Sequence, residues 1–389
     1  MISGWVILDK PSGMTSRAAG SRVAKMFGVK KFGHLGTLDP MASGVLPIAL
    51  GQATKMIPYI PLLGRGAERI RGGEGCLYTN EPSPSVGYAD CHPSEGGEKE
   101  YIFSIVWGYE TDTLDVTGTE TKRDNRFPPY DEIDAACRKF IGEIDQVPPA
   151  YSAVHIGGRR AYELARRGAA VEIPARKITI YALQIVPPPA QPAVSPTPPK
   201  GGVANSSHLS RSFQRINHSP LGGSPNRVSD LGGGTNKTSF IVECSTGTYV
   251  RSIARDIGAA AGGYLATVSL IRRTRTHQFA IKDAVSLDFL ENLVHNAPVD
   301  AAKCLHPIDF GLDDILVLNL NSNDAKLFQN GGFITPTQDL LSDKSPSKSI
   351  PPPKGAGKVL LRRTYSDGKF IGIGEIEDEI LKPKRIINI

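Results

Sequence analysis

The chain has 389 residues, which exceeds one average domain and predicts one large domain with a smaller one. Its net charge of +6 is compatible with a polyanionic partner. Five cysteines without a C-x-x-C pair argue against a disulfide framework, and a zinc site would need Cys76, Cys91 and His92 to converge from a flexible stretch. The first residues hold no apolar run long enough for a signal peptide or a membrane span, so we expect a cytoplasmic protein.

The first hundred residues predict two strands and one helix. Residues 4–9 form a short apolar run, and a basic helix follows, capped by Thr15 or Ser16. Residues 45–50 predict a buried strand. Residues 64–98 are rich in Gly, Ser and Glu with almost no apolar period, so we expect an inserted, disordered loop.

The middle of the chain alternates between regular patterns and a second biased segment. Residues 101–107 carry apolar side chains on both faces, which predicts a central strand. Residues 131–141 and 159–167 predict helices. Residues 187–237 are Pro-rich and then Ser/Gly/Asn-rich, so we expect a second flexible insert there. Residues 240–244 predict a strand.

The remaining chain predicts one helix and a compact tail. Val250, Ile253, Ala254 and Ile257 are spaced i, i+3, i+4, i+7, which predicts a helix that turns this face toward the core. From about Phe310 onward the strand patterns KVLLRRTY and FIGIGEI predict a small β domain tethered to the main one.

The densest chemical signal is the segment GHLGTLDPMASGVLPIALGQATK at 33–55. Asp39 precedes Pro40, which favours an extended or turn conformation, and nearby glycines allow another chain segment to approach closely. A carboxylate in a glycine-lined turn suits a nucleophile or a base. On this pattern alone, an Asp-Pro turn that merely caps itself is the commoner interpretation.

This segment resembles the catalytic motif of the bacterial TruB family of tRNA pseudouridine-55 synthases. Three further segments resemble the same family in the same order, and the C-terminal tail is similar to a PUA-like RNA-binding domain. The resemblance covers nearly everything outside the two inserts, which have no counterpart in the family pattern. The three segments are KEYIFSIVWGYETDTLDVTG (99–118), QVPPAYSAVHIGGRRAYELARRG (146–168) and CSTGTYVRSIARDIG (244–258), the last followed by IRR at 271–273.

The resemblance implies a mixed α+β fold. The pseudouridine synthase catalytic domain would span residues 1–309 around a mostly antiparallel sheet, and the PUA-like domain would span residues 310–389. The implied activity is isomerisation of the T-loop uridine at tRNA position 55. The reaction breaks the N1–C1′ bond and joins C5 to C1′ without gaining atoms, so we expect no cofactor and no metal. We expect the tRNA T-arm as the partner, and a monomer that requires no protein partner.

The resemblance also implies catalytic residues. Asp39 would attack C1′, attack C6 of the base, or remove a ribose proton. Arg251 would pair with Asp39 and oppose the rise in pKa that burial causes in a carboxyl group. Tyr101 would stack on the extruded uracil, and Tyr249 would be a second active-site tyrosine. Ordinary core packing is the alternative for either tyrosine.

Further residues are expected to bind RNA. The resemblance implies that His34 fills the space left by a uridine that is pulled out of the stacked T-loop. Basic residues would contact phosphates, with a solvated face as the alternative. His155 stands where the family often has lysine, so one RNA contact becomes titratable. The predicted phosphate-binding residues are Arg159, Arg160, Arg166, Arg272 and Arg273.

Two other functions remain open at the level of the sequence. The first is a non-catalytic tRNA-binding chaperone, which would not require Asp39, Tyr101 and Arg251 together. The second is a guide-RNA-dependent rRNA pseudouridine synthase, against which the bacterial-like ending GVLPIALGQATK and the short tail argue.

Overall fold

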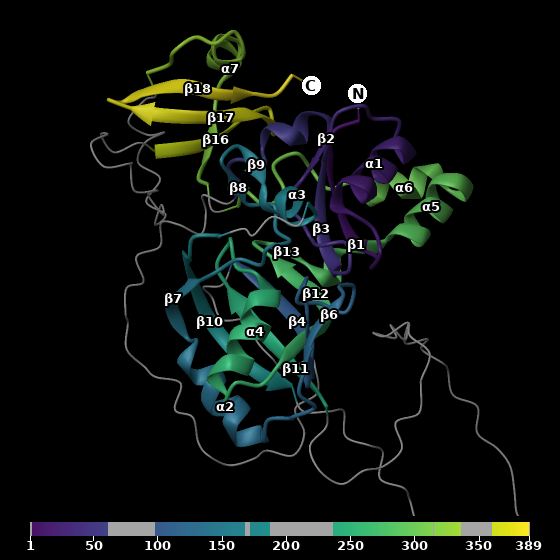
Figure 1. Cartoon of the computed structure of the whole chain (residues 1–389). Helices are drawn as coiled ribbons and strands as arrows, with labels where there is room; N and C mark the ends of the chain where they lie inside the picture. The colour runs from purple at the N-terminus through teal and green to yellow at the C-terminus, as the bar shows by residue number, and fades with distance from the viewer. Residues whose placement is uncertain are drawn as a thin grey trace, which may run out of the picture.

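The computed structural model describes residues 2–60, 98–167, 172–186, 236–313, 315–335 and 360–388. Both predicted inserts lie almost entirely outside these ranges, as do Cys76, Cys91 and His92. Figure 1 shows a large sheet with helices packed on it and, beside the N-terminal strands, the small C-terminal sheet. Within the described residues, no helix is long and apolar enough to cross a membrane.

The N-terminal elements match the predicted ones closely. Of the two predicted capping residues, Thr15 is the N-cap, and its hydroxyl accepts a hydrogen bond from the backbone N–H of Ala18 at 3.1 Å. The elements are β1 (Gly4–Lys10), α1 (Ser16–Met26), β2 (Phe32–His34), β3 (Ser43–Leu50) and the 3-10 helix η1 (Gly51–Lys55).

The central elements complete one large sheet. Its strand order is β14-β1-β3-β12-β4-β11-β10-β7, with β2 on β3 and β13 on β12. Only the β1–β14 and β3–β12 pairs are parallel among its described pairs, so the sheet is mostly antiparallel, as predicted. The strands are β4 (Lys99–Trp107), β7 (Gly142–Gln146), β10 (Arg176–Val186), β11 (Lys237–Cys244), β12 (Ala266–Thr276), β13 (Phe279–Ala280) and β14 (Val285–Ser286).

The strand β4 is central in the sheet because β12 and β11 pair on its two sides, which confirms the prediction from its two apolar faces. The helices α2 (Tyr130–Lys139) and α4 (Val250–Ala260) contact each other, and they pack on β10 and β12 respectively. All four apolar residues of the predicted α4 stripe are buried. A small hairpin, β5 (Tyr109–Thr111) with β6 (Glu120–Arg123), follows β4.

The predicted helix at 159–167 is wrong in its first part. Gly157 and Gly158 have φ values of 55° and 81° and form a two-residue hairpin turn between β8 (His155–Ile156) and β9 (Arg159–Arg160). Glycine adopts these left-handed angles without steric cost, so the hairpin forms where a longer helix was expected. Only α3 (Ala161–Ala165) is helical.

The C-terminal elements form a four-stranded sheet of order β15-β16-β17-β18, on which α7 packs. This confirms a small β domain in the tail. The connecting helices α5 and α6 flank α1 and β1 (Figure 1). The bounds are η3 (Ile281–Asp283), α5 (Leu287–Asn296), α6 (Pro298–Lys303), β15 (Val317–Asn319), α7 (Ser322–Gln329), β16 (Leu360–Ser366), β17 (Lys369–Glu377) and β18 (Ile380–Ile386).

The C-terminal sheet packs against the large sheet through a shared apolar core, whereas the sequence predicted only a tethered domain. Phe370 and Ile373 of β17 belong to the same buried apolar cluster as Trp5 of β1 and Met56 after η1. Trp5 also donates its indole N–H to the carbonyl of Ile308 at 2.9 Å. Because burial of such side chains contributes roughly 1.5–3 kcal/mol each, this shared core fixes the position of the small sheet.

Candidate active site

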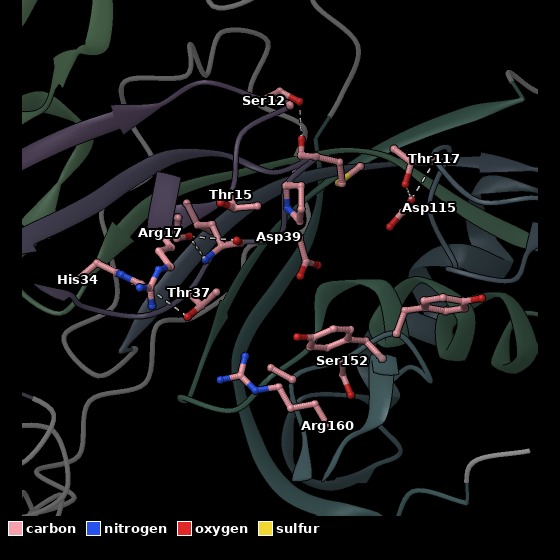
Figure 2. Close-up of a pocket in the computed structure, with 18 of the residues that line it drawn as sticks. Ser12, Thr15, Arg17, His34, Thr37, Asp39, Asp115, Thr117, Ser152 and Arg160 are labelled. Atoms are coloured by element: carbon pink, nitrogen blue, oxygen red, sulfur yellow. Dashed lines mark hydrogen bonds between the residues drawn. The ribbon is translucent and has the colours of Figure 1, made fainter. Parts of the chain in front are cut away.

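The loop between β2 and β3 forms one wall of a pocket of about 1200 Å³. Asp39 lies at its tip, and Figure 2 shows the carboxylate pointing into the space between the loop and the segment that carries Ser152 and Arg160. The start of α1, residues after β5 and Arg251 of α4 also line it. Segments distant in sequence therefore converge around the carboxylate that was predicted to be catalytic.

Hydrogen bonds to the segment between β1 and α1 hold this loop in place. The Ser16 hydroxyl accepts from the N–H of Leu38 at 2.8 Å and donates to its carbonyl at 3.1 Å. The N–H of Gly13 donates to the carbonyl of Pro40 at 2.8 Å. Asp39 is thus flanked on both sides by fixed backbone, which preorganises its side chain.

Lys10 of β1 supports the same loop from the interior of the protein. Its side chain is fully buried, and the ammonium donates to the carbonyls of Met14 at 2.7 Å and Pro40 at 3.4 Å. Burial lowers the pKa of Lys10 to about 8, and the carboxylate of Asp39 opposes this shift. Lys10 therefore contributes a positive potential behind the carboxylate without lining the pocket.

Glycines allow β12 to approach the loop, as the sequence predicted. A Cβ on Gly44, where φ is 102°, would lie 2.1 Å from the carbonyl oxygen of Arg273, and one on Gly36 would lie 3.0 Å from its guanidinium. Both distances are shorter than an ordinary Cβ contact, so larger residues at either position would push the loop away from β12.

Arg251 joins two carboxylates at the base of the pocket. Its Nε lies 2.9 Å from an oxygen of Asp39, and its Nη1 lies 3.4 Å from an oxygen of Asp115. The guanidinium also donates to the carbonyls of Thr113 at 2.8 Å and Tyr151 at 3.0 Å. Only 5% of the arginine side chain is exposed, against 36% for Asp39, so the fixed cation faces a carboxylate that solvent or substrate can reach.

Asp115 is the inner carboxylate of this group. It is 3% exposed and accepts hydrogen bonds from the Thr113 hydroxyl at 3.0 Å and from the N–H of Thr117 at 2.9 Å, besides the Thr117 hydroxyl. These donors stabilise its charge in a buried position. Asp115 thereby orients Arg251 through Nη1, and Nε of the guanidinium remains for Asp39.

The two predicted tyrosines occupy different positions. Tyr249 precedes α4, where Gln146 binds its backbone N–H and carbonyl, and burial raises the pKa of its phenol while Asp39 acts in the same direction. Tyr101 lies in β4, opposite Arg273 of β12, and is 6% exposed. Neither Tyr101 nor Tyr249 is one of the residues that line the pocket. Stacking of Tyr101 on a base therefore stays a prediction.

Cationic side chains surround the mouth of the pocket. Arg160 lines it from one side, and Arg17 lines it together with His34 from the other (Figure 2). Arg166 also belongs to the lining. The His34 ring is 3.2 Å from the Thr37 hydroxyl, and burial, followed by Arg273 and Arg17, lowers its pKa. His34 is therefore neutral at pH 7. Arg159 is exposed outside this lining.

The expected RNA contacts of Arg272 and Arg273 are not supported by their surroundings. Arg272 forms a bidentate ion pair with Asp9 at 2.7 and 3.1 Å. Arg273 is fully buried, so it cannot contact RNA in this structure, and that prediction is wrong. Its guanidinium instead donates to the carbonyls of Val45 and Gly36, both at 2.8 Å. The sequence pattern showed that these residues are charged, but it could not show that Arg273 is buried.

We expect Arg273→Met to destabilise the fold by roughly 3 kcal/mol, because two buried carbonyls would lose charged donors. Urea unfolding of wild-type protein and variant measures this difference. Arg272→Met, in the neighbouring position but with a partly exposed ion pair, is the control and should cost less than about 1 kcal/mol. Equal stability of the two variants would contradict a structural role for Arg273.

Comparison with known proteins decides the family. The description "TruB family pseudouridylate synthase (N terminal domain)" matches residues 24–65 and 92–194, and "Pseudouridine synthase II TruB, C-terminal" matches residues 317–387. A "tRNA pseudouridine synthase B" of Caulobacter vibrioides is 32% identical over 100% of this chain and 97% of its own length. One of Brucella ovis is 33% identical over 99% and 95%. The chain belongs to the TruB family.

Solved structures support the same fold for this TruB family member. The chain in "Crystal Structure of a Cbf5-Nop10-Gar1 Complex" has a TM-score of 0.51 at 19% identity, covering 96% of this chain and 78% of its own. "Structure of H/ACA RNP bound to a substrate RNA containing 2'-deoxyuridine" gives 0.52 at 19%, covering 96% and 77%. At such identity the similarity shows the fold alone.

The sequence interpretation missed several residues of this TruB family site. Asp115 lies in the segment TDTLDVTG, which was noted for its resemblance, but no role was assigned to it. Its signal was a carboxylate with threonines two positions away on either side, a pattern that lets a carboxylate bind its own loop. Ser16 and Lys10 carried no chemical signal, because their roles depend on the distant loop that they hold. The described residues contain no cluster of potential metal ligands.

Proposed function

We propose that this protein is the tRNA pseudouridine-55 synthase that isomerises the T-loop uridine. The observation that carries this proposal is the ion-paired group of Asp39, Arg251 and Asp115 at the base of a pocket with cationic walls. A polyanion is attracted to such walls, and a pocket of about 1200 Å³ has room for an extruded nucleoside. The relatives named tRNA pseudouridine synthase B support tRNA as the substrate.

The arrangement suits a reaction that needs one ionised carboxylate within reach of the substrate. Asp39 remains accessible while Arg251 keeps a fixed positive charge beside it. That guanidinium cannot deprotonate, so it stabilises the carboxylate throughout the pH range of the reaction. Asp39 can then attack C1′, attack C6 or remove a ribose proton; each route ends with C5 joined to C1′ and the C5 proton released.

The roles of the other predicted residues belong to the same proposal. His34 replaces the extruded base, Tyr249 and Tyr101 support the uracil, and the arginines at 160 and 166 bind phosphates of the T-arm. The C-terminal domain is PUA-like and begins near residue 310. The protein works in the cytoplasm as a monomer without a cofactor, metal or protein partner.

The test is conversion of a synthetic T-arm stem-loop by the purified full chain in buffer with EDTA and without nucleotide. Mass spectrometry after cyanoethylation, which labels pseudouridine, should place one modified residue at the T-loop uridine. A stem-loop with cytidine at that position is the matched control and should stay unlabelled. If the wild-type chain leaves the uridine unmodified in both a stem-loop and full-length tRNA, the proposal fails.

A further inference from the structure

Three cations gather where the C-terminal sheet meets the catalytic domain. Lys55, at the end of η1, donates from its ammonium to the carbonyl of Ile386 in β18 at 2.8 Å. Burial, then Lys31, then Arg385 lower the pKa of Lys55. Both of these neighbours are cationic, and Arg385 directly precedes Ile386, to whose carbonyl Lys55 is hydrogen-bonded, so positive charge is concentrated at this junction.

The neighbouring acid does not neutralise these cations. Glu375 of β17 forms an ion pair with Lys384, whose ammonium lies 2.5 Å from its carboxylate. Arg385 is exposed and bonds instead to the phenol of Tyr59, which belongs to the catalytic domain. Its guanidinium is therefore held at the junction by a neutral partner, and its charge remains available to an external anion.

The cluster adjoins the pocket of Asp39. Lys30 and Lys31, just before β2, line that pocket, and so does Ile57 just beyond η1. The N–H of Gly51, at the start of η1, donates to the carbonyl of Lys31 at 2.8 Å, which ties the two segments together. An RNA chain that leaves the pocket on this side would meet Lys31 first and the cations of the junction next.

We propose that Lys31, Lys55 and Arg385 form a phosphate-binding site for the backbone of the substrate RNA outside the pocket. This inference rests on the proposed function, since it takes the RNA in the pocket as given. Arg385 brings the C-terminal domain into substrate binding, and the apolar core around Trp5 and Phe370 fixes that arginine relative to Asp39. The site reads no sequence, because phosphates carry none.

The experiment compares the full chain with its Lys55→Gln and Arg385→Gln variants in binding full-length tRNA transcript by fluorescence anisotropy from 50 to 300 mM KCl. Each variant should weaken binding about fivefold and reduce the slope of log K against log salt by roughly one, as loss of one phosphate contact predicts. The KM should rise with kcat retained, because Asp39 and Arg251 are untouched. Lys326→Gln, which replaces an exposed lysine of α7 in the same domain, should change neither the affinity nor the salt slope.

Lys55→Arg separates charge from a structural role, since it keeps the cation and should bind tRNA as wild type does. Melting temperatures of all variants identify any that opens the junction. Unchanged affinity and salt slope in both glutamine variants would overturn the inference, and so would equal losses in Lys326→Gln. Failure of the proposed function is distinct: the wild-type chain would then form no pseudouridine, whatever these affinities show.

Discussion

Asp39→Asn should lower the rate of pseudouridine formation by at least roughly 10⁴-fold while tRNA binding stays within about threefold of wild type. The amide has the size of the carboxylate but cannot act as nucleophile or base. Single-turnover conversion and anisotropy measure the two quantities separately. Because Asp39 is partly exposed and Arg251 keeps Asp115, we expect less than about 1 kcal/mol of lost stability.

The matched control is Asp256→Asn. Asp256 pairs with Arg255 on α4 at a similar exposure, outside the pocket lining. It should retain wild-type conversion. Normal activity of Asp39→Asn would show that Asp39 is not part of the mechanism. Loss of tRNA binding by the same variant would show that Asp39 binds RNA and does not act in the chemical step.

Arg251→Met should both destabilise the protein and slow the reaction. Methionine leaves the 3% exposed carboxylate of Asp115 without a cation, and removal of one partner from a buried pair costs about 3–5 kcal/mol. Asp39 loses the charge that stabilises its ionised form, so kcat should fall by roughly a hundredfold to a thousandfold. Urea unfolding and single-turnover conversion measure these effects.

Two control variants test whether the losses in Arg251→Met are specific to this arginine. Arg255→Met removes a partly exposed arginine one turn further along α4 and should change stability by less than about 1 kcal/mol and kcat very little. Arg251→Lys keeps the charge without the planar fork and should recover part of both losses. A fully active, correctly folded Arg251→Met would show that the ion pair is incidental.

The same assays distinguish the proposed function from the two alternatives, a non-catalytic tRNA chaperone and a guide-RNA-dependent synthase. A tRNA chaperone without chemistry would fold tRNA equally well with aspartate or asparagine at position 39, and no variant would alter a pseudouridine signal. A guide-RNA-dependent synthase would modify a bare tRNA transcript only after guide RNA and protein partners were added. Conversion of the bare transcript by wild-type protein alone excludes both.

Local sequence predicted the regular elements because their causes are local. The cap at Thr15, the two apolar faces of residues 101–107 and the helical spacing from Val250 to Ile257 all reappear in the structure. The exception is 159–167, where the apolar spacing of Ala161, Leu164 and Ala165 suggested a helix, while Gly157 and Gly158 made a hairpin. The preference of these two glycines for a tight turn outweighs the helix propensity of the residues that follow them.

By itself the sequence determined the family, the order of the elements and the carboxylate at position 39, because motif residues and apolar periods are written along the chain. Only the tertiary structure decided which charges meet. It buried Arg273 under the loop of Asp39, joined Asp115 to Arg251 and placed Arg385 beside Lys55. The physical reason is that burial and ion pairing depend on distances across the sheet, which residue spacing along one strand does not specify.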